Sequence, residues 1–231
     1  MTNDDSPASS LQPPTSPIII AIDGPSASGK GTVAKKLAAH FGFAHLDTGL
    51  LYRAVGMAVV QSGGDPSAPL LAEQEARALD VEKLNDPALR DDAASVAASK
   101  VAAIPAVRAA LLRFQKDFCA HPPHDKPGAV LDGRDIGTVI APDAPVKIYV
   151  TASVEARAER RFKELQQRGE AAAYATVLKD MQERDTRDTT RSAAPLKPAA
   201  DAIMLDTTNM SAYEAFNAAL NIVRQKIKAP G

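Results

Sequence analysis

Short apolar runs alternate along the chain with longer segments of helical pattern. Five runs have the length and composition of buried strands, at 18–22, 43–46, 129–131, 146–150 and 202–205. After the first run and a glycine-rich stretch, Val33, Leu37 and Phe41 fall on one face, which predicts a helix that ends near Gly42. Alternation of strands with helices is typical of an α/β domain with a parallel sheet.

Further helices are predicted from propensity, capping and chain breakers. We expect one at about 50–61, one within 91–120 that is interrupted where Pro105 starts a new segment, and a last one at 212–228. Two more are expected at 153–170, with Ser153 as the N-cap, and at 172–185. The stretch HPPHDKPG at 121–128 is expected to form a surface loop.

Length and composition favour one main domain. The chain has 231 residues, 45% of them hydrophobic, which is enough for one sizeable core over 18–231. The first 17 residues are acidic, rich in Pro and Ser and without an apolar stretch, so we expect a disordered tail and not a signal peptide.

Charge and cysteine content narrow the class of partner. Twenty-seven basic and 28 acidic residues give a net charge of −1, and aromatic residues make up 4%, which argues against a nucleic-acid or anionic-membrane partner. Cys119 is the single cysteine, and no apolar run approaches the roughly 18 residues of a membrane span. A cytoplasmic protein is expected.

The chemistry-bearing residues follow the ends of the predicted strands. The glycine-rich stretch comes after the first run, Asp47 after the second, and Asp132-Gly133-Arg134-Asp135 after the third. Ligands of open α/β sheets bind outside the carboxyl ends of the strands. These residues should therefore share one edge of the sheet.

The glycine-rich stretch AIDGPSASGKGT matches a phosphate-binding loop. Gly24-x4-Gly29-Lys30 has a strand before it and a helix after it, a context that argues against the alternative of a merely tight Gly/Ser turn. Glycines let backbone N–H groups face anions, and the lysine reaches the β- and γ-phosphates. Gly31 stands where the general pattern has Ser or Thr, and the resulting GKGT resembles the loop of nucleoside monophosphate kinases.

Arginines are clustered in a chain that is neutral overall. A monophosphate acceptor is mostly a dianion at neutral pH, so its kinase needs fixed positive charge and not a general base. The clustered arginines are Arg53, Arg108, Arg134, Arg157, Arg160, Arg161, Arg184, Arg187 and Arg191. Arg157 and Arg161 are spaced i, i+4 and suit two contacts to a triphosphate, although an ordinary charged helix face explains them as well. For each arginine alone, a solvated surface pair is the alternative.

Six segments in order carry a resemblance to the bacterial cytidylate kinase family. They are IDGPSASGKGT, LDTGLLYRA, AASKVAAIPAVRAAL, LDGRDIGTVIAPDAPVKIYVTAS, RAERR and ERDTRDTTRSAAPLKPAADAIMLDTT. The resemblance covers about 18–228 and implies a P-loop kinase core with a five-stranded parallel sheet of order 2-3-1-4-5. It also implies a substrate-binding insert at about 63–110 and a lid at about 156–191. The family's insert usually contains a short β-sheet, and this chain's shorter insert lacks an alternating hairpin pattern.

The resemblance also implies binding residues at matching positions. The ATP phosphates are assigned to the loop residues Gly24, Pro25, Ser26, Ala27, Ser28, Gly29, Lys30, Gly31 and Thr32. The acceptor phosphate is assigned to Thr48, Arg53, Arg134 and Arg191, the ribose to Arg184 and Asp188, and cytosine to Ser99, Arg108 and Asp135. The implied catalytic set is Lys30, Arg134, Arg184 and Arg191.

Two carboxylates have a chemical rationale beside the resemblance. Asp135 can accept from the exocyclic amine of cytosine, where uracil has a carbonyl, although an Asp that caps or turns the chain after a strand is the alternative. Magnesium is expected on ATP without a direct protein ligand. Asp132 can orient it through water, and a turn-forming Asp before Gly133 explains that residue nearly as well.

The expected reaction is in-line transfer of the ATP γ-phosphoryl group to CMP, with dCMP as the second acceptor by resemblance. The resemblance also favours a monomer. Two alternatives stay open within enzymes, an AMP or UMP kinase and a small-molecule alcohol kinase. From another class, a module that binds ATP without transfer is the alternative.

Overall fold

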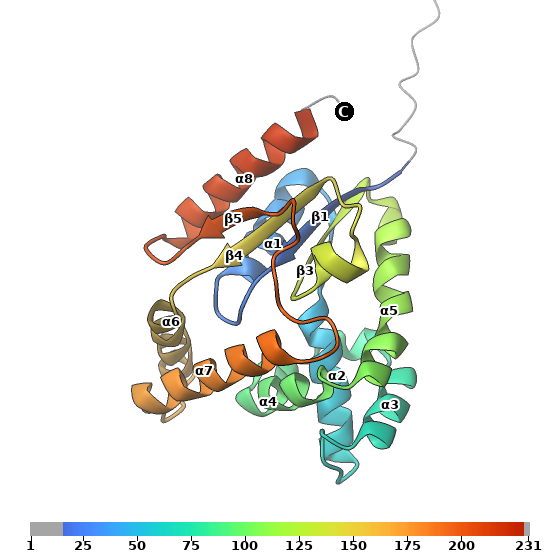
Figure 1. Cartoon of the computed structure of the whole chain (residues 1–231), viewed down its shortest axis with the longest axis vertical. Coiled ribbons are helices and arrows are strands. Elements are labelled where there is room, and N and C mark those ends of the chain that lie inside the picture. The colour runs from blue at the N-terminus through green and yellow to red at the C-terminus, as the bar shows by residue number, and fades with distance from the viewer. Residues whose placement is uncertain (1–15, 229–231) are drawn as a thin grey trace, which may run out of the picture.

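The computed structural model describes residues 16–228 and contains a five-stranded parallel sheet (Figure 1). The tail expected at 1–17 falls almost wholly on residues 1–15, which lie outside the described residues. The strands are β1 (Ile18–Asp23), β2 (Ala44–Asp47), β3 (Gly128–Gly133), β4 (Val146–Thr151) and β5 (Ile203–Asp206). Their order is β2-β3-β1-β4-β5, which confirms the predicted order.

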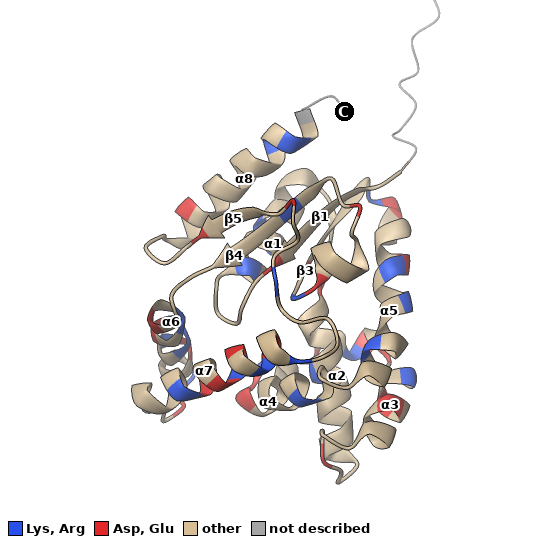
Figure 2. Ribbon diagram, viewed as in Figure 1, with Lys and Arg blue, Asp and Glu red and all other residues tan. Residues whose placement is uncertain are grey.

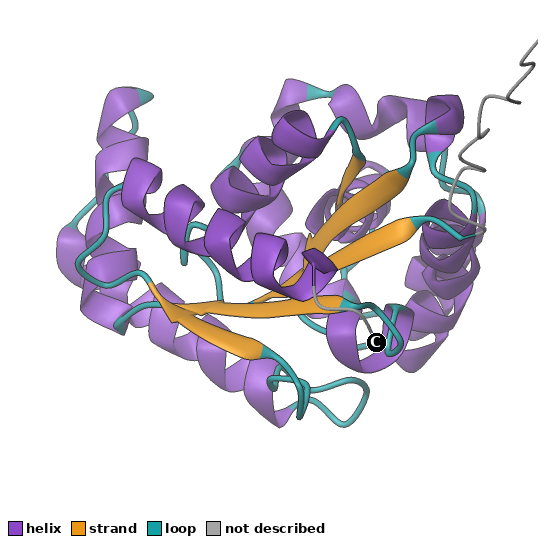
Figure 3. Cartoon of the chain, turned by 90° about the horizontal axis from the view of Figure 1, so that it is seen from above, coloured by secondary structure: helices purple, strands orange, loops and turns teal. Residues whose placement is uncertain are grey.

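Helices cover both faces of the sheet (Figures 1 and 3). On one face, α1 (Lys30–Phe41) and α8 (Ala212–Lys228) pack on Ile20 and Ile22 of the central strand. On the other face, α5 (Pro105–Ala120) and the short π-helical turn η4 (Ile136–Ile140) pack on Ile19 and Ala21. Every strand position from 19 to 22 is therefore buried, as a continuous apolar run in a parallel sheet requires.

The insert region is built from helices alone. The predicted range of about 63–110 contains α3 (Pro69–Arg77), α4 (Asp92–Val101), the 3₁₀ turns η1 (Val81–Asn85) and η2 (Pro87–Arg90), and the start of α5, and it follows α2 (Thr48–Gln61). Together with α2 and α5, these helices enclose an apolar core around Leu51, Val55, Val101 and Leu111. The break at Pro105, which is the first residue of α5, is confirmed, and the loop after α5 includes a 3₁₀ turn, η3 (Pro123–Asp125).

The region predicted as a lid consists of two consecutive helices that pack on each other, α6 (Val154–Gln167) and α7 (Tyr174–Thr190). Ser153 caps α6 as expected, because its hydroxyl accepts from the backbone N–H of Ala156 at 3.2 Å. A small cluster that includes Leu165, Val177 and Met181 holds the pair together apart from the sheet. This separate packing is compatible with motion of α6 and α7 as one unit, so the lid remains a prediction.

Within residues 16–228, no single helix is both long and apolar enough to cross a membrane. Among the described residues, the segments 92–101 and 105–125 taken together have the length and composition of a membrane span, but they are bent by 103° relative to each other.

Gly56 of α2 makes a testable contact with α4. A β-carbon at this position would lie 2.7 Å from the β-carbon of Ala97, so the two helices touch backbone to backbone. Alanine normally favours a helix by about 1 kcal/mol over glycine. Here we expect Gly56→Ala to lower the free energy of unfolding by about 1 to 3 kcal/mol, because the added methyl overpacks the interface.

Denaturant unfolding of the two proteins measures this change. Val60→Ala, on the exposed side of the same helix at 45% exposure, is the matched control and should change stability by only about 0.5 kcal/mol. A Gly56→Ala protein as stable as the parent would contradict the close packing of α2 on α4.

Candidate active site

The glycine loop between β1 and α1 forms an anion-binding surface of backbone. A β-carbon at Gly24 would lie 2.0 Å from the carbonyl oxygen of Val150, so only glycine fits at the start of the loop. At its end Gly29 has a φ of 88° and no side chain caps α1. The first N–H groups of α1 are thus free to bind an anion, and the helix dipole favours one.

Lys30 lies half-buried at the first position of α1, and its ammonium group donates to the carbonyl oxygen of Pro25 at 3.1 Å. Burial, together with the neighbouring Arg134, lowers the pKa of Lys30 to about 7. Asp132 and Asp47 act in the opposite direction. A lysine with such a pKa is ready to take up a proton when anionic phosphates arrive.

Gly31 faces the carboxylate of Asp132. A β-carbon on Gly31 would lie 3.6 Å from Asp132 Oδ2, so a longer side chain at position 31 would meet the carboxylate. Asp132 is itself 2% exposed at the end of β3. Position 31 at the first turn of α1 is therefore a direct neighbour of a carboxylate.

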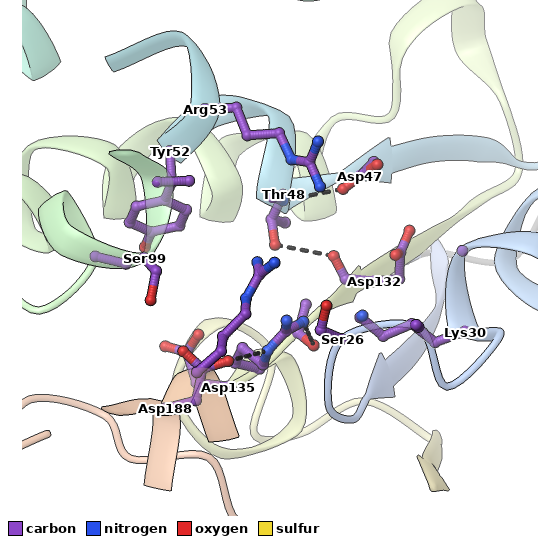
Figure 4. Close-up of a pocket in the computed structure, with 18 of the residues that line it drawn as sticks. Ser26, Lys30, Asp47, Thr48, Tyr52, Arg53, Ser99, Asp132, Asp135 and Asp188 are labelled. Atoms are coloured by element: carbon purple, nitrogen blue, oxygen red, sulfur yellow. Dashed lines mark hydrogen bonds and ion pairs between the residues drawn. The ribbon is translucent and has the colours of Figure 1, made fainter. Parts of the chain in front are cut away.

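A cavity of about 190 Å³ opens beside the glycine loop, at the carboxyl ends of β2 and β3 (Figure 4). Lys30 and Ser26 lie on one side of it, and Tyr52 and Ser99 on the other. The expected convergence at one sheet edge is observed. All nine predicted acceptor residues line this cavity, namely Thr48, Arg53, Ser99, Arg108, Arg134, Asp135, Arg184, Asp188 and Arg191.

Two buried ion pairs order the far wall of this cavity. Arg134 Nε donates to Asp188 Oδ2 at 2.8 Å, and Arg108 pairs with Asp135 while its guanidinium lies 5.4 Å from the ring centre of Tyr52. Burial favours the neutral form of Asp188, but Arg134 and Arg184 outweigh it and hold the pKa of this carboxyl below its usual range. The two pairs hold these long side chains in place, and the donors and acceptors that the pairs do not use are available to a ligand in the cavity.

Three buried side-chain atoms within residues 16–228 have no hydrogen-bond partner, and all three lie at this site. They are Ser28 Oγ in the glycine loop, Arg184 Nε and Arg191 Nη2. Burial and the nearby Arg134 also lower the pKa of Arg184, to about 10. Unpaired buried donors are costly, and an anion that accepts from them would remove that cost.

A second cavity of about 440 Å³ lies across the glycine loop from the first. The loop contributes 27–33 to its wall, and the rest comes from Arg160, Glu164, Thr207, Met210, Ser211, Ala212 and Ala215. Arg160 Nη1 donates to Thr207 Oγ1 at 3.2 Å, and Arg160 also bonds the carbonyl of Thr207. Ala27, Lys30 and Gly31 line both cavities, so the two lie side by side, as direct transfer between two ligands requires.

The arginines on α6 make ion pairs and contacts that the sequence did not predict. Arg157 is 4% exposed, donates to both carboxylate oxygens of Asp185 on α7 and to the carbonyl of Ala152, and lines neither cavity. Arg161 pairs with Asp92 and faces a separate cavity between α4, α6 and α7. Arg157 and Arg160 both donate to carbonyl groups of the glycine loop, Arg157 to Ser26 at 3.4 Å and Arg160 to Ala27 at 3.5 Å. The assignment of Arg157 and Arg161 to ATP stays a prediction.

Sequence reasoning missed the role of Asp23, the last residue of β1. Its two carboxylate oxygens accept from the backbone N–H groups of Ile136 and Gly137, each at 2.8 Å. Burial raises the pKa of Asp23 to about 6, against the effect of these two bonds. The contact anchors η4, and with it the preceding turn that carries Arg134 and Asp135. An acidic residue at the end of a predicted central strand was the only available signal.

Charged positions alternate along α6 and α7, which lie across from the carboxyl ends of the strands (Figure 2). The cavity at the strand ends has six cationic and four acidic side chains in its wall. The local excess of positive charge in an otherwise neutral chain, next to a phosphate-binding loop, defines the protein as a P-loop enzyme of the phosphotransferase type.

Comparison with known proteins gives the family. Residues 20–225 match the family described as cytidylate kinase, and the chain belongs to this family. It is 62% identical over 208 residues to the cytidylate kinase of Paramagnetospirillum magneticum, and these residues are 90% of this chain and 98% of the relative. It is 58% identical to the cytidylate kinase of Rhodospirillum rubrum, with the same coverage of both chains. It is 57% identical to that of Rhodopseudomonas palustris, over 89% of this chain and 95% of the relative.

Proposed function

We propose that this chain transfers the γ-phosphoryl group of ATP to the phosphate of CMP, giving ADP and CDP, with dCMP as a second acceptor. The observation that carries the proposal is the pair of buried, unpartnered guanidinium nitrogens, Arg184 Nε and Arg191 Nη2, in a cavity that Lys30 joins to the glycine loop. A protein that only binds ATP has no need of a second anion site. Membership of the cytidylate kinase family supports CMP as the acceptor.

On the donor side, backbone N–H groups of the glycine loop bind the β- and γ-phosphates, and the cavity that Arg160 and Thr207 line accepts the base. Magnesium on the phosphates supplies charge neutralisation, and the single carboxylate of Asp132 fits a contact to it through water, since this hard cation keeps several waters. Lys30 follows the charge that moves from donor to acceptor.

On the acceptor side, the proposal assigns the phosphate to Thr48, Arg53, Arg134 and Arg191, the ribose to Arg184 and Asp188, and cytosine to Ser99, Arg108 and Asp135. Arg108 bonds one carboxylate oxygen of Asp135, which leaves the other to accept from the exocyclic amine of cytosine. The acceptor dianion needs no general base, so the arginines contribute positioning and stabilisation of negative charge. Closure of 156–191 as a lid would exclude water.

An acceptor panel tests the proposed function. ADP release from magnesium-ATP should be fast with CMP and dCMP and at least about 100-fold slower with UMP and AMP, because buried polar groups left unpaired by the wrong base are costly. Preferred transfer to UMP, AMP or an alcohol would replace the acceptor assignment. ATP binding without transfer to any acceptor would favour a binding module. Monomeric state and cytoplasmic residence remain separate predictions.

Asp135→Asn tests the cytosine contact. The amide can donate to the uracil carbonyl where the carboxylate repels it, so we expect the ratio of kcat/KM for CMP to that for UMP to fall by at least about tenfold. Steady-state kinetics with both acceptors measure the ratio. Asp143→Asn, on an exposed turn, is the control and should leave the ratio unchanged. An unaltered ratio in Asp135→Asn would remove this residue from base selection.

Lys30 predicts a pH dependence of ATP binding. Its pKa of about 7 means that at pH 8 the free protein holds Lys30 mostly neutral, and bound phosphates raise this pKa. Binding of magnesium-ATP should then take up about 0.9 proton at pH 8 and less than about 0.1 at pH 6. The affinity for magnesium-ATP is therefore highest below pH 7 and decreases as the pH rises above 7.

Calorimetry in two buffers of different ionisation enthalpy measures this uptake. Lys30→Arg keeps its charge over the whole range and should show no uptake at pH 8. Equal uptake in the parent and in Lys30→Arg would assign the proton to another group.

A further inference from the structure

His45 of β2 makes a contact that the proposed mechanism does not use. Its Nε2 lies 2.8 Å from Asp132 Oδ1, while the other oxygen of this carboxylate faces Gly31 and the start of α1. Asp132 Oδ1 can only accept, so Nε2 carries the proton in this bond. Within the described residues, His45 is the one side chain that hydrogen-bonds the Asp132 carboxylate.

Strand pairing explains why these two side chains meet. In the parallel register of β2 and β3, Asp47 pairs with Asp132 and His45 pairs with Val130. Side chains two positions apart share a face, so His45 is the diagonal neighbour of Asp132 on the face that α1 covers. Asp47 lies directly opposite Asp132, and a like charge at that position is unfavourable. The N–H group of His45 offsets this repulsion at Asp132, while Asp47 itself accepts from the backbone N–H of Gly49.

His45 lies outside the space where ligands bind. Its side chain is 20% exposed at the edge of the sheet, against 3% for Asp132, and it lines neither the acceptor cavity nor the cavity beside Arg160. Any effect of His45 on the reaction must therefore pass through the carboxylate that it holds.

We propose that His45 is a positioning residue that holds the Asp132 carboxylate in the orientation in which its free oxygen faces the metal-bearing phosphates of the donor. The assignment rests on the proposed function for the identity of that donor. Without the His45 bond the carboxylate can turn about its last torsion, and its charge is no longer fixed beside α1. Loss of a group that orients a direct metal ligand commonly costs 10- to 100-fold in metal affinity, and because Asp132 acts through water we expect the lower end of this range, about tenfold.

Equilibrium binding tests the proposal without phosphoryl transfer. His45→Leu should weaken binding of magnesium-ATP about tenfold by calorimetry and leave binding of ATP in the absence of a divalent cation within about twofold. His45→Gln, which offers an amide N–H at a similar reach, should recover most of the loss. His40→Leu, an exposed histidine at the end of α1, is the matched control and should bind as the parent does.

A double-mutant cycle separates positioning from general damage to the fold. In an Asp132→Asn background, where the charge to be oriented is absent, His45→Leu should cause no further loss of magnesium-ATP affinity. In kinetics, His45→Leu should raise the magnesium concentration required for half-maximal rate and leave the KM for CMP unchanged. Thermal unfolding of every variant shows whether it is folded.

Four outcomes would overturn the proposal. They are parental magnesium-ATP affinity in His45→Leu, an equal loss with and without the metal, failure of Gln to rescue, and additive losses in the cycle. Since all of these outcomes are measured by ATP binding, they test the positioning role of His45 even if the protein does not phosphorylate CMP.

Discussion

The contact between Asp23 and the backbone of Ile136 and Gly137 is the interaction on which the site depends. Asp23 ends the central strand, and the glycine loop begins at the next residue. The same carboxylate therefore ties the phosphate-binding loop to the turn that carries Arg134 and Asp135. Burying this carboxylate is costly, as its raised pKa indicates, and the two bonds from backbone N–H groups offset part of that cost.

The charged side chains at the carboxyl ends of the strands are arranged around the turn that Asp23 fixes. Arg134 and Arg108 are held by Asp188 and Asp135, so their positions are set before any ligand arrives. Arg184 and Arg191 keep unpaired N–H groups, and Lys30 has a lowered pKa. Mutual proximity of cations in a buried space is unfavourable in the free protein, and an anion between them relieves it. Relief of this repulsion therefore contributes part of the free energy with which the site binds an anion.

Most of the fold was predictable, because its signals are local. Apolar runs, Pro105 and Ser153 each act on their own neighbours in the chain, and the strands and helix boundaries that they predict were found within a few residues. The all-helical insert was predictable only as the lack of a hairpin. The pairing of Arg157 with Asp185 was not, because these residues are 28 apart in the chain and meet only where α6 packs on α7.

The sequence by itself determined the phosphate-binding loop, the convergence of charged residues at one sheet edge and the family, because glycine spacing and strand order place backbone and side chains directly. Only the tertiary structure decided which arginines donate to the loop, which charges are paired, and that His45 contacts Asp132. The physical reason is that such contacts depend on strand register and on side-chain direction between segments distant in sequence. A linear pattern of charges contains neither.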